Sequence, residues 1–416
     1  MINPPFFTMD DFDFTNKTIL LRVDFNSPVD PKTNAILDDS RFKAHLPTIQ
    51  ELFKSKVIVL SHQSRPGKKD FTNLKIHADL LSSLLRKRVK FVPGLFEEPA
   101  LKEIENSRPG EILMLDNTRF YSEEIVLSDE PPEVLSSTHI VRELSKVSDY
   151  FINDAFATAH RPNVTVTGFA LTIPNIAGRL MEKEVMGVEK FFSIKDSPKV
   201  GIFGGAKADD SIKIIDRMLS ENRLNYVLTG GLVGHLFIVA SGFDMGEKNM
   251  NVLKKEVPNL DDILKKVVNL ISKYGDIIKY PTDFIGNDNG KPVYYTMENF
   301  RKDIPAMDIG INTIAEYSSI IKNAKGIVLN GPMGVFELED YSAGTREVFN
   351  SVARSSAYKV GGGGHTNAAM EKFNLAHYID HLSTGGGALI SYLAGELMPG
   401  IESLKLSKAK FGGDKA

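Results

Sequence analysis

Residues 199–207, KVGIFGGAK, decide the fold of the second half of this chain. The apolar run from Val200 to Phe203 is typical of a buried strand, and it enters a pair of glycines and a lysine. Beyond them Ile212, Ile215 and Leu219 recur at i, i+3 and i+7, which predicts a helix with one buried face. The N-terminus of that helix faces the glycine turn, where its free amides and macrodipole favour a phosphate.

The same succession of apolar run, polar turn and amphipathic stretch recurs along the chain, and it is the pattern of βα units in a parallel sheet. In the first half, runs beginning at Thr18, Val57, Ile112 and Tyr150 lead into RVDFN, SHQSRPG, DNTRF and NDAFATAHRP. In the second half, runs beginning at Tyr226, Ile327 and Tyr358 lead into TGG, NGPMGVFE and GGGGHT. Ligands of open α/β sheets bind outside the carboxyl ends of the strands, so these exits outline the binding faces.

Length and composition narrow the class of protein. The 416 residues exceed the roughly 250–300 that one hydrophobic core supports, so we expect two domains, with an interdomain helix over residues 178–194. The absence of cysteine excludes disulfides and thiolate chemistry. Residues 1–14 lack the pattern of a signal peptide, and the glycine-rich uncharged stretch 226–243 predicts a buried strand, turn and helix rather than a membrane span. We therefore expect a cytoplasmic protein.

The exits of the first half carry positive charge. The net charge of the chain is −3, yet residues 17–90 hold 15 Lys and Arg against 7 Asp and Glu, an excess of 15 − 7 = +8. Five arginines lie in or near the exits, and polar residues join them: Arg22, Arg41, Arg65, Arg119 and Arg161, with Asp24, Asn26, His62 and His160. A guanidinium forks onto carboxylate and phosphate oxygens, so this anion face suits a small anionic substrate. Ordinary surface salt bridges are the alternative for each arginine taken alone.

The exits of the second half are rich in glycine, which allows backbone amides to approach a phosphate closely. Lys207 adds a mobile point charge, and residues 361–366 and 383–388 each precede a predicted helix. Glu337 could hold ribose hydroxyls or simply be an exposed loop glutamate. Neither GxxxxGK[ST] nor a full GxGxxG occurs, so the common nucleotide-binding and dehydrogenase signatures are missing.

Seven motifs resemble those of the phosphoglycerate kinase family, and they occur in this order along the chain: RVDFN, SRPG, NDAF.TAHR, FGGAK, NGPMGVFE, GGGHT and STGGGA. Two of them, NGPMG and GGGHT, resemble the archaeal members of the family. The resemblance implies two doubly wound parallel-sheet α/β domains joined by a hinge helix. Residues 1–178 would bind phosphoglycerate, 179–197 would form the interdomain helix, 198–398 would bind Mg²⁺-nucleotide, and 399–416 would return to the first domain. The implied activity is reversible phosphoryl transfer between 1,3-bisphosphoglycerate and ADP by a monomer.

The resemblance also implies roles for individual residues. The phosphoglycerate positions are Asp24, Asn26, Arg41, His62, Arg65, Arg119 and Arg161, with Arg41 as the catalytic arginine. The nucleotide positions are Gly205, Ala206, Lys207, Gly230, Gly231, Pro281, Gly310, Asn330, Glu337, Gly363, Gly364, His365 and Thr366. Lys207 is the second catalytic residue expected, and Mg²⁺ is the expected cofactor.

Two positions depart from the family pattern. His365 stands where most members have the aspartate that holds magnesium, and Ser211 stands where most have a second lysine. These losses leave the metal ligand unknown and would permit a non-catalytic nucleotide sensor on the same fold. The presence of Arg41 and Lys207 favours the enzyme. Helical geometry predicts that Ser211 lies near the phosphate site and that Lys213, about 200° around the helix, faces solvent.

Overall fold

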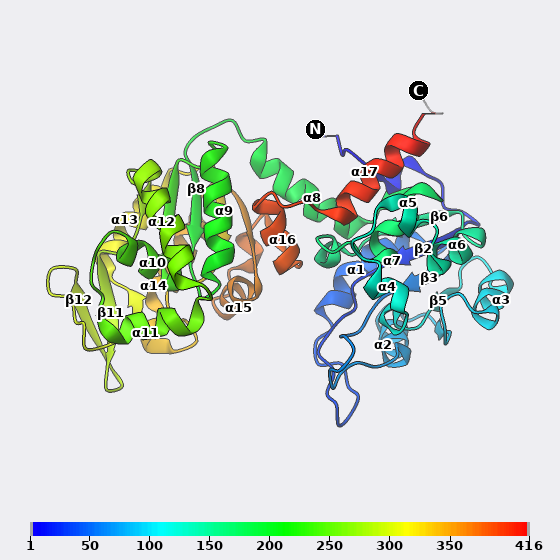
Figure 1. Ribbon diagram of the computed structural model, residues 1–416, viewed down its shortest axis with the longest axis horizontal. Coiled ribbons are helices and arrows are strands. Elements are labelled where there is room, and N and C mark those ends of the chain that lie inside the picture. The colour runs from blue at the N-terminus through cyan, green and yellow to red at the C-terminus, as the bar shows by residue number, and fades with distance from the viewer. Residues whose placement is uncertain (1–2, 414–416) are drawn as a thin grey trace. The chain divides into compact units, whose positions relative to one another are not determined.

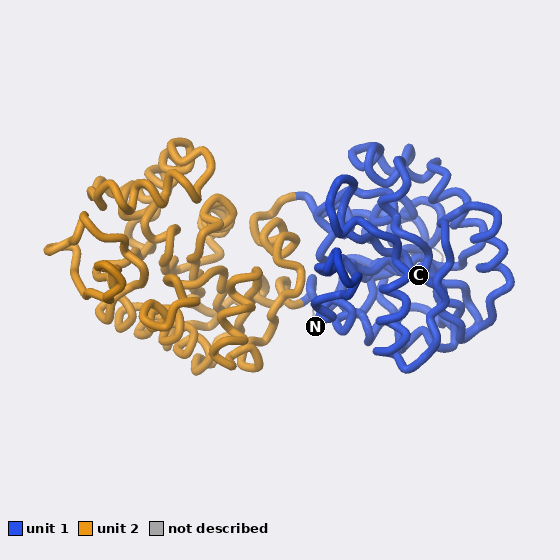
Figure 2. Tube along the Cα trace, turned by 90° about the horizontal axis from the view of Figure 1, so that it is seen from below, with its two compact units in different colours: residues 1–186, 397–416 blue, residues 187–396 orange. Residues whose placement is uncertain are grey.

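Two parallel sheets, each in a separate compact unit, organise the chain (Figure 1). The computed structural model describes residues 3–413. Unit 1 contains residues 1–186 and 397–416, and unit 2 contains residues 187–396 (Figure 2). The fold is therefore α/β with two parallel-sheet domains, as the strand exits predicted.

The sheet of unit 1 has seven parallel strands in the order β1-β7-β6-β2-β3-β5-β4. The strands are β1 (Phe7–Thr8), β2 (Thr18–Arg22), β3 (Lys56–Leu60), β4 (Val89–Phe91), β5 (Ile112–Met114), β6 (Tyr150–Asn153) and β7 (Asn175–Ala177). The helices are α1 (Ser40–Glu51), α2 (Lys75–Leu85), α3 (Glu98–Asn106), α4 (Ser122–Val126), α5 (Pro132–Leu135), α6 (His139–Lys146) and α7 (Val164–Thr167).

Both faces of this sheet are buried under helices. Alternate side chains of a strand point to opposite faces, so Ile19 and Leu21 pack with α1 and α2. Leu20, between them, packs on the other face with α3 and α6. A sheet covered on both faces leaves its strand ends open to ligands, and the anion face lies at those carboxyl ends.

Unit 2 repeats this plan with a six-stranded parallel sheet in the order β10-β9-β8-β14-β15-β16. Its strands are β8 (Lys199–Phe203), β9 (Tyr226–Thr229), β10 (Ile278–Lys279), β14 (Gly326–Asn330), β15 (Tyr358–Gly362) and β16 (His381–Ser383). Its helices are α9 (Ala208–Ser220), α10 (Gly231–Ala240), α11 (Gly246–Glu256), α12 (Leu260–Tyr274), α13 (Ile311–Lys322), α14 (Ala343–Arg354), α15 (Gly364–Lys372) and α16 (Gly386–Leu393).

A small antiparallel sheet interrupts the βα pattern of unit 2. Its strands are β11 (Asp283–Asp288), β12 (Lys291–Thr296) and β13 (Ala306–Ile309), in the order β12-β11-β13. The pattern of apolar runs and phosphate turns does not predict this sheet, although the Asn289-Gly290 turn between β11 and β12, with φ of 52° and 87°, is a hairpin signal. Phe284 and Tyr295 of this sheet form a separate core with Ile304, which precedes β13, and with residues of α10.

Two further helices connect or complete the units. The helix α8 (Arg179–Phe192) runs from unit 1 into unit 2, where the sequence predicts the interdomain helix. The last helix, α17 (Pro399–Phe411), belongs to unit 1 and contacts β7 and α7 (Figure 1). It buries Ile401 and Leu404, and the Ser407 hydroxyl accepts a hydrogen bond from the Asn175 amide at 2.7 Å.

The stretch 226–243 forms β9, a glycine turn and α10, with most of the helix buried. The prediction of a buried strand, turn and helix is therefore confirmed. Among residues 3–413, no helix has the length and apolar character needed to cross a membrane.

Candidate functional site

The anion face of unit 1 is built around Asp24, which follows β2 and is buried. Arg41, on the first turn of α1, donates from Nη1 to Asp24 Oδ2. His62, which follows β3, has its Nδ1 4.0 Å from Asp24 Oδ1, and it is also buried. Because β2 and β3 are neighbours in the sheet, their exits bring these residues together as the sequence predicted.

A buried arginine sets the state of His62. Arg22, the last residue of β2, places Nη2 3.2 Å from His62 Nδ1. A guanidinium can only donate, so Nδ1 accepts and the ring proton sits on Nε2. Burial lowers the pKa of His62 well below 6.5, and the charges of Arg22, Arg119, Arg161 and Arg41 lower it further. The imidazole is therefore neutral, with one N–H to offer a ligand.

Arg22 itself is held by a buried acidic partner. Its Nε donates to the Thr165 hydroxyl at 2.9 Å, and that hydroxyl donates to Glu124 at 2.6 Å. The carboxylate of Glu124 lies 3.9 Å from the guanidinium, and both side chains are about 1 % exposed. Arg22 thus supports the anion face from behind, and it is not available to bind a substrate directly.

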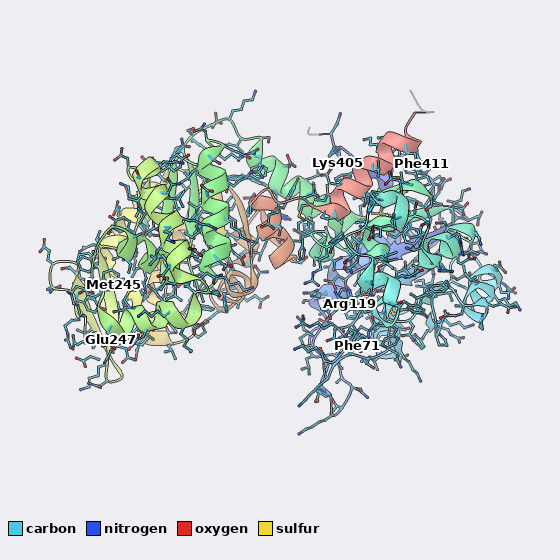
Figure 3. The ribbon with its side chains drawn as sticks, in the orientation of Figure 1. Phe71, Arg119, Met245, Glu247, Lys405 and Phe411 are labelled. Atoms are coloured by element: carbon cyan, nitrogen blue, oxygen red, sulfur yellow. The ribbon has the colours of Figure 1, made fainter. Side chains whose placement is uncertain are left out.

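The remaining predicted residues of the anion face differ in exposure. Asn26 accepts a hydrogen bond from the Ser64 amide at 2.8 Å, and Arg119 donates to the Ser64 carbonyl at 2.5 Å. The pKa of Arg119 is lowered by burial and by the nearby charges of Arg161 and Arg22. Arg65 and Arg161 are exposed. Figure 3 shows where Arg119 and Phe71 lie on unit 1.

Unit 2 contains a cavity of about 450 Å³, which we call the glycine-loop cavity. Predicted nucleotide residues that line it are Gly205, Ala206, Gly231, Pro281, Glu337 and His365. Apolar side chains, among them Val252, Phe284 and Met333, form much of the remaining wall. A cavity of this size with mostly apolar walls and a few polar groups suits a planar ring with a polar tail.

The loops that border the cavity touch through their backbones. Gly205 N donates to the Pro332 carbonyl at 2.8 Å, and Gly231 N donates to the Met333 carbonyl at 2.7 Å. Glycine is needed because a Cβ on Gly204 would overlap the Pro332 carbonyl, and Gly331 has a φ of +97°. The amides of Gly205 and Gly231 are therefore used within the protein, where they hold the loops together.

A second group of predicted residues lies beside the cavity without lining it. Thr366 is buried, and its hydroxyl accepts a hydrogen bond from Gly331 N at 2.8 Å. Gly363 precedes α15 with a φ of +101°, and Gly364 begins that helix. The Nδ2 of Asn330 is buried and has no hydrogen-bond partner among the described residues. Gly230 and Gly310 are the N-cap residues of α10 and α13.

Helix α9 separates its polar residues as helical geometry predicts. Lys207 is the N-cap residue and is exposed. Lys213 also faces solvent, with its side chain 51 % exposed and its Nζ 3.4 Å from Glu396. Ser211, however, is 1 % exposed and does not line the cavity, so its hydroxyl is covered in this structure and its place near a phosphate stays a prediction. It lies on the buried side of α9, beside Ile212 and Ile215.

A magnesium ion held by the protein would need a set of oxygen ligands from its side chains. Among the described residues, no three His, Asp or Glu side chains come together as metal ligands do. His365 is exposed at the cavity, but imidazole is a poor ligand for magnesium. The donor set therefore does not fit a metal ion held by the protein alone.

Several functional candidates carried no signal in the sequence motifs. Asp308, on β13, lines the cavity, and burial raises its pKa to about 7 although the Gly344 and Ile309 amides oppose this shift. Glu124 supports Arg22 from a short helix more than a hundred residues away along the chain. In each case the relevant neighbour comes from a distant element, so spacing along the chain gives no indication.

Comparisons with known proteins identify the family of this chain. The family model for phosphoglycerate kinase matches residues 9–396. A phosphoglycerate kinase of Thermoplasma acidophilum is 50 % identical over 408 residues, covering 98 % of this chain and 99 % of the relative. One of Methanothermus fervidus is 44 % identical over 407 residues, covering 97 % of this chain and 98 % of the relative.

Solved structures give the same result. The phosphoglycerate kinase of Pyrococcus horikoshii matches with a TM-score of 0.87 and 42 % identity, covering 97 % of this chain and all of the other. That of Coxiella burnetii matches with a TM-score of 0.82 and 30 % identity, covering 96 % and 99 %. With seven sequence motifs, two parallel-sheet units and near-complete coverage in agreement, the chain belongs to the phosphoglycerate kinase family.

Proposed function

We propose that this enzyme transfers a phosphoryl group in line from 1,3-bisphosphoglycerate to ADP, giving 3-phosphoglycerate and ATP, and that it also runs the reverse reaction. Membership of the family carries the activity. The contrast between the anion face and the glycine-loop cavity supports the assignment of the two substrates to separate units. The first gathers arginines around a neutral histidine, and the second is an apolar cavity bordered by helix N-termini.

Phosphoglycerate binds at the anion face in this proposal. Its carboxylate and phosphate are anions, and Arg41, Arg119 and Arg161 supply positive charge close to His62. The Nε2–H of His62 is a directed donor, because Arg22 occupies the other ring nitrogen. Asp24 and Asn26 follow β2 beside them and are suited to the substrate hydroxyl.

The nucleotide binds at the glycine-loop cavity. Phe284, Val252 and Met333 offer apolar surface to the base, and Glu337 offers a carboxylate to the ribose. Phosphates then lie toward the N-termini of α9 and α15, where unpaired amides and the helix dipoles favour negative charge. The unpartnered Nδ2 of Asn330 would gain an acceptor from the ligand.

The transfer needs no general base. In the direction that consumes ATP, the acceptor is a carboxylate with a pKa of about 3.5, which is already ionised at neutral pH. The residues of the enzyme therefore act by alignment and by compensating the charge on the transferring group. We assign that compensation to Arg41 from unit 1 and to Lys207 with the helix N-terminal amides from unit 2.

Magnesium enters with the nucleotide in this proposal. Phosphate and water oxygens are the hard ligands it prefers, and no cluster of carboxylates within residues 3–413 is placed to replace them. Magnesium bound to phosphate would offset part of the phosphoryl charge. We assign to His365 no ligation of the ion.

Hinge closure about α8 would exclude water from the transferring group.

The decisive test is a coupled assay of ATP formation from 1,3-bisphosphoglycerate and ADP with the full-length protein. Amide chemical shifts of the full chain locate the ligands. 3-Phosphoglycerate alone should perturb residues around Asp24, and ADP alone should perturb residues around Gly205. Absence of ATP formation, or the opposite pattern of shifts, would refute the proposal.

A further inference from the structure

One face of α1 connects the anion face to the start of α8. Four of its polar residues recur at intervals of four, three and three residues, which places them along one side of the helix: Arg41, His45, Thr48 and Glu51. Arg41 binds Asp24 at the ligand end. At the other end, the Thr48 hydroxyl accepts from Arg179 N at 2.9 Å, and Glu51 accepts from the Arg179 guanidinium at 2.8 Å.

His45 forms the central link of this face. Its Nε2 accepts a hydrogen bond from the backbone N–H of Asp24 at 3.1 Å, and its Nδ1 lies 2.6 Å from Asp154 Oδ2. A backbone amide can only donate, so Nε2 carries no proton, and Nδ1–H donates to the carboxylate. The side chain is 2 % exposed. His45 thus holds one fixed tautomer between two partners of opposite kind.

Asp154 carries the link into α8. It follows β6, and its Oδ1 accepts from Leu180 N at 2.9 Å and from Met181 N at 3.4 Å. The residue before the helix is Gly178, which has no side chain to cap it, and a Cβ there would overlap the Asp154 carboxylate. Asp154 therefore serves as the cap from another element, and one carboxylate receives both His45 and the helix N-terminus.

We propose that His45 is a positioning residue that couples occupancy of the anion face at Asp24 to the N-terminus of α8 through Asp154. This inference rests on the proposed binding of phosphoglycerate at the anion face. A ligand that draws on Asp24 and Arg41 shifts the turn after β2, and the His45 ring passes that shift to the carboxylate that caps α8. The helix that leads into unit 2 thereby senses whether substrate is bound.

Two substitutions of His45 each remove one of its two hydrogen bonds and keep the other. In His45→Asn the amide nitrogen can occupy the place of Nδ1, which keeps the bond to Asp154 and loses the bond to Asp24. In His45→Gln the longer amide can reach the place of Nε2, which keeps Asp24 and loses Asp154. Lys43→Ala is the matched control, because Lys43 lies on the solvent side of α1 and forms an exposed ion pair with Asp39 at 2.9 Å.

The measurement is amide hydrogen exchange at Leu180 and Met181 in the full-length protein, with and without 3-phosphoglycerate, together with steady-state kinetics. In the unsubstituted protein and in Lys43→Ala, the ligand should slow exchange by at least about fivefold. Both His45 variants should lose this response. His45→Asn should also raise the KM for 3-phosphoglycerate by about three- to thirtyfold without changing the KM for ATP, whereas His45→Gln should keep both KM values.

A purely structural role would instead change exchange and both KM values together in the two variants. If the His45 variants respond to the ligand as the unsubstituted protein does, the coupling is refuted while the proposed function stands. If the unsubstituted protein does not bind 3-phosphoglycerate near Asp24 by calorimetry and chemical shift, both proposals fail. Should the His45 variants unfold, Asp154→Asn provides the same test, because its remaining oxygen still caps Leu180 while the pairing with His45 is changed.

Discussion

The two proposed sites of this enzyme differ in the groups that form them. The anion face of unit 1 is made of charged side chains, and buried side chains such as Arg22 and Glu124 hold them in place. The glycine-loop cavity of unit 2 is bordered by backbone, and the loops that form it hydrogen-bond to each other through Gly205, Gly231 and the 331–333 segment.

This difference follows from the ligands. A small dianion has little surface, so most of its binding must come from directed charges. A nucleotide offers a large apolar ring and a phosphate chain, so a shaped cavity and helix N-termini suffice. The anion face should therefore be sensitive to the loss of single charges, and the cavity should be sensitive to added volume.

The largest effects should come from the two cations nearest the proposed transfer. Arg41→Ala and Lys207→Ala should each lower turnover by at least about a hundredfold, the scale of losing one transition-state donor. Steady-state kinetics with both substrates varied will measure this. Arg41→Ala should also raise the KM for 3-phosphoglycerate, because its charge serves the anion face in the ground state as well. A Lys207→Ala enzyme with turnover within tenfold of the unsubstituted value would contradict the assignment.

Added volume in the glycine loops should be the next most damaging change. A Cβ on Gly331 would overlap the Gly204 carbonyl, and its φ of +97° strains any other residue. Gly331→Ala should lose about 1–3 kcal/mol of stability from the backbone alone, and its affinity for ADP should fall with it. The control is Gly361→Ala, where a Cβ would meet its neighbours at an ordinary 3.5 Å. Chemical denaturation and calorimetry with ADP measure both quantities, and equal losses in the two variants would refute the steric argument.

The units should also respond to pH in opposite directions through one group each. Burial raises the pKa of Asp308 from 3.8 to about 7, so the folded state binds the extra proton. Its contribution to the stability of unit 2 is therefore present below pH 3.8 and is lost as pH rises through about 7. The pKa of His62 is lowered below 6.5, so the contribution of His62 to unit 1 is present above that pH and is lost on acidification.

A substitution isolates the contribution of Asp308 to the pH dependence of stability. Between pH 4 and 7, Asp308→Asn should flatten the fall in stability with rising pH relative to the unsubstituted protein. The quantity to compare is the difference in stability between Asp308→Asn and the unsubstituted protein at each pH. Burial also lowers the pKa of His235 in unit 2 to about 4, so His235 changes the stability of both proteins with pH in the opposite direction. Denaturation midpoints measured across this range provide the test. A variant whose pH profile matches that of the unsubstituted chain would show that Asp308 is ionised throughout.

Much of this architecture could be predicted because it is local in the sequence. The strand-turn-helix units follow from apolar periodicity and glycine, and these signals hold wherever tertiary structure does not oppose them. Glu124 behind Arg22 and Asp308 at the cavity could not be predicted, since each depends on a partner from a distant element. The hairpin of β11 and β12, in contrast, is local, and its Asn289-Gly290 turn is a signal that predicts it. Ser211 shows the limit of helical geometry. Helical periodicity correctly placed it away from Lys213, but it did not predict that this side of α9 is buried in the core.

The smallest effect on turnover should come from substituting Lys213. This variant best tests whether unit 2 differs from unit 1 in how it compensates phosphate charge. If unit 2 compensates phosphate charge mainly through helix N-termini and Lys207, a second lysine on α9 is unnecessary. Lys213 points into solvent with its Nζ 3.4 Å from Glu396, and such an exposed ion pair has little energetic value. Lys213→Ala should therefore change turnover by less than about threefold, whereas Lys207→Ala costs at least about a hundredfold. The two variants are matched in charge and lie on the same helix, so steady-state kinetics compare position alone. A defect in Lys213→Ala as severe as that in Lys207→Ala would mean that α9 presents another face to the nucleotide, and that unit 2, like unit 1, depends on an array of side-chain charges.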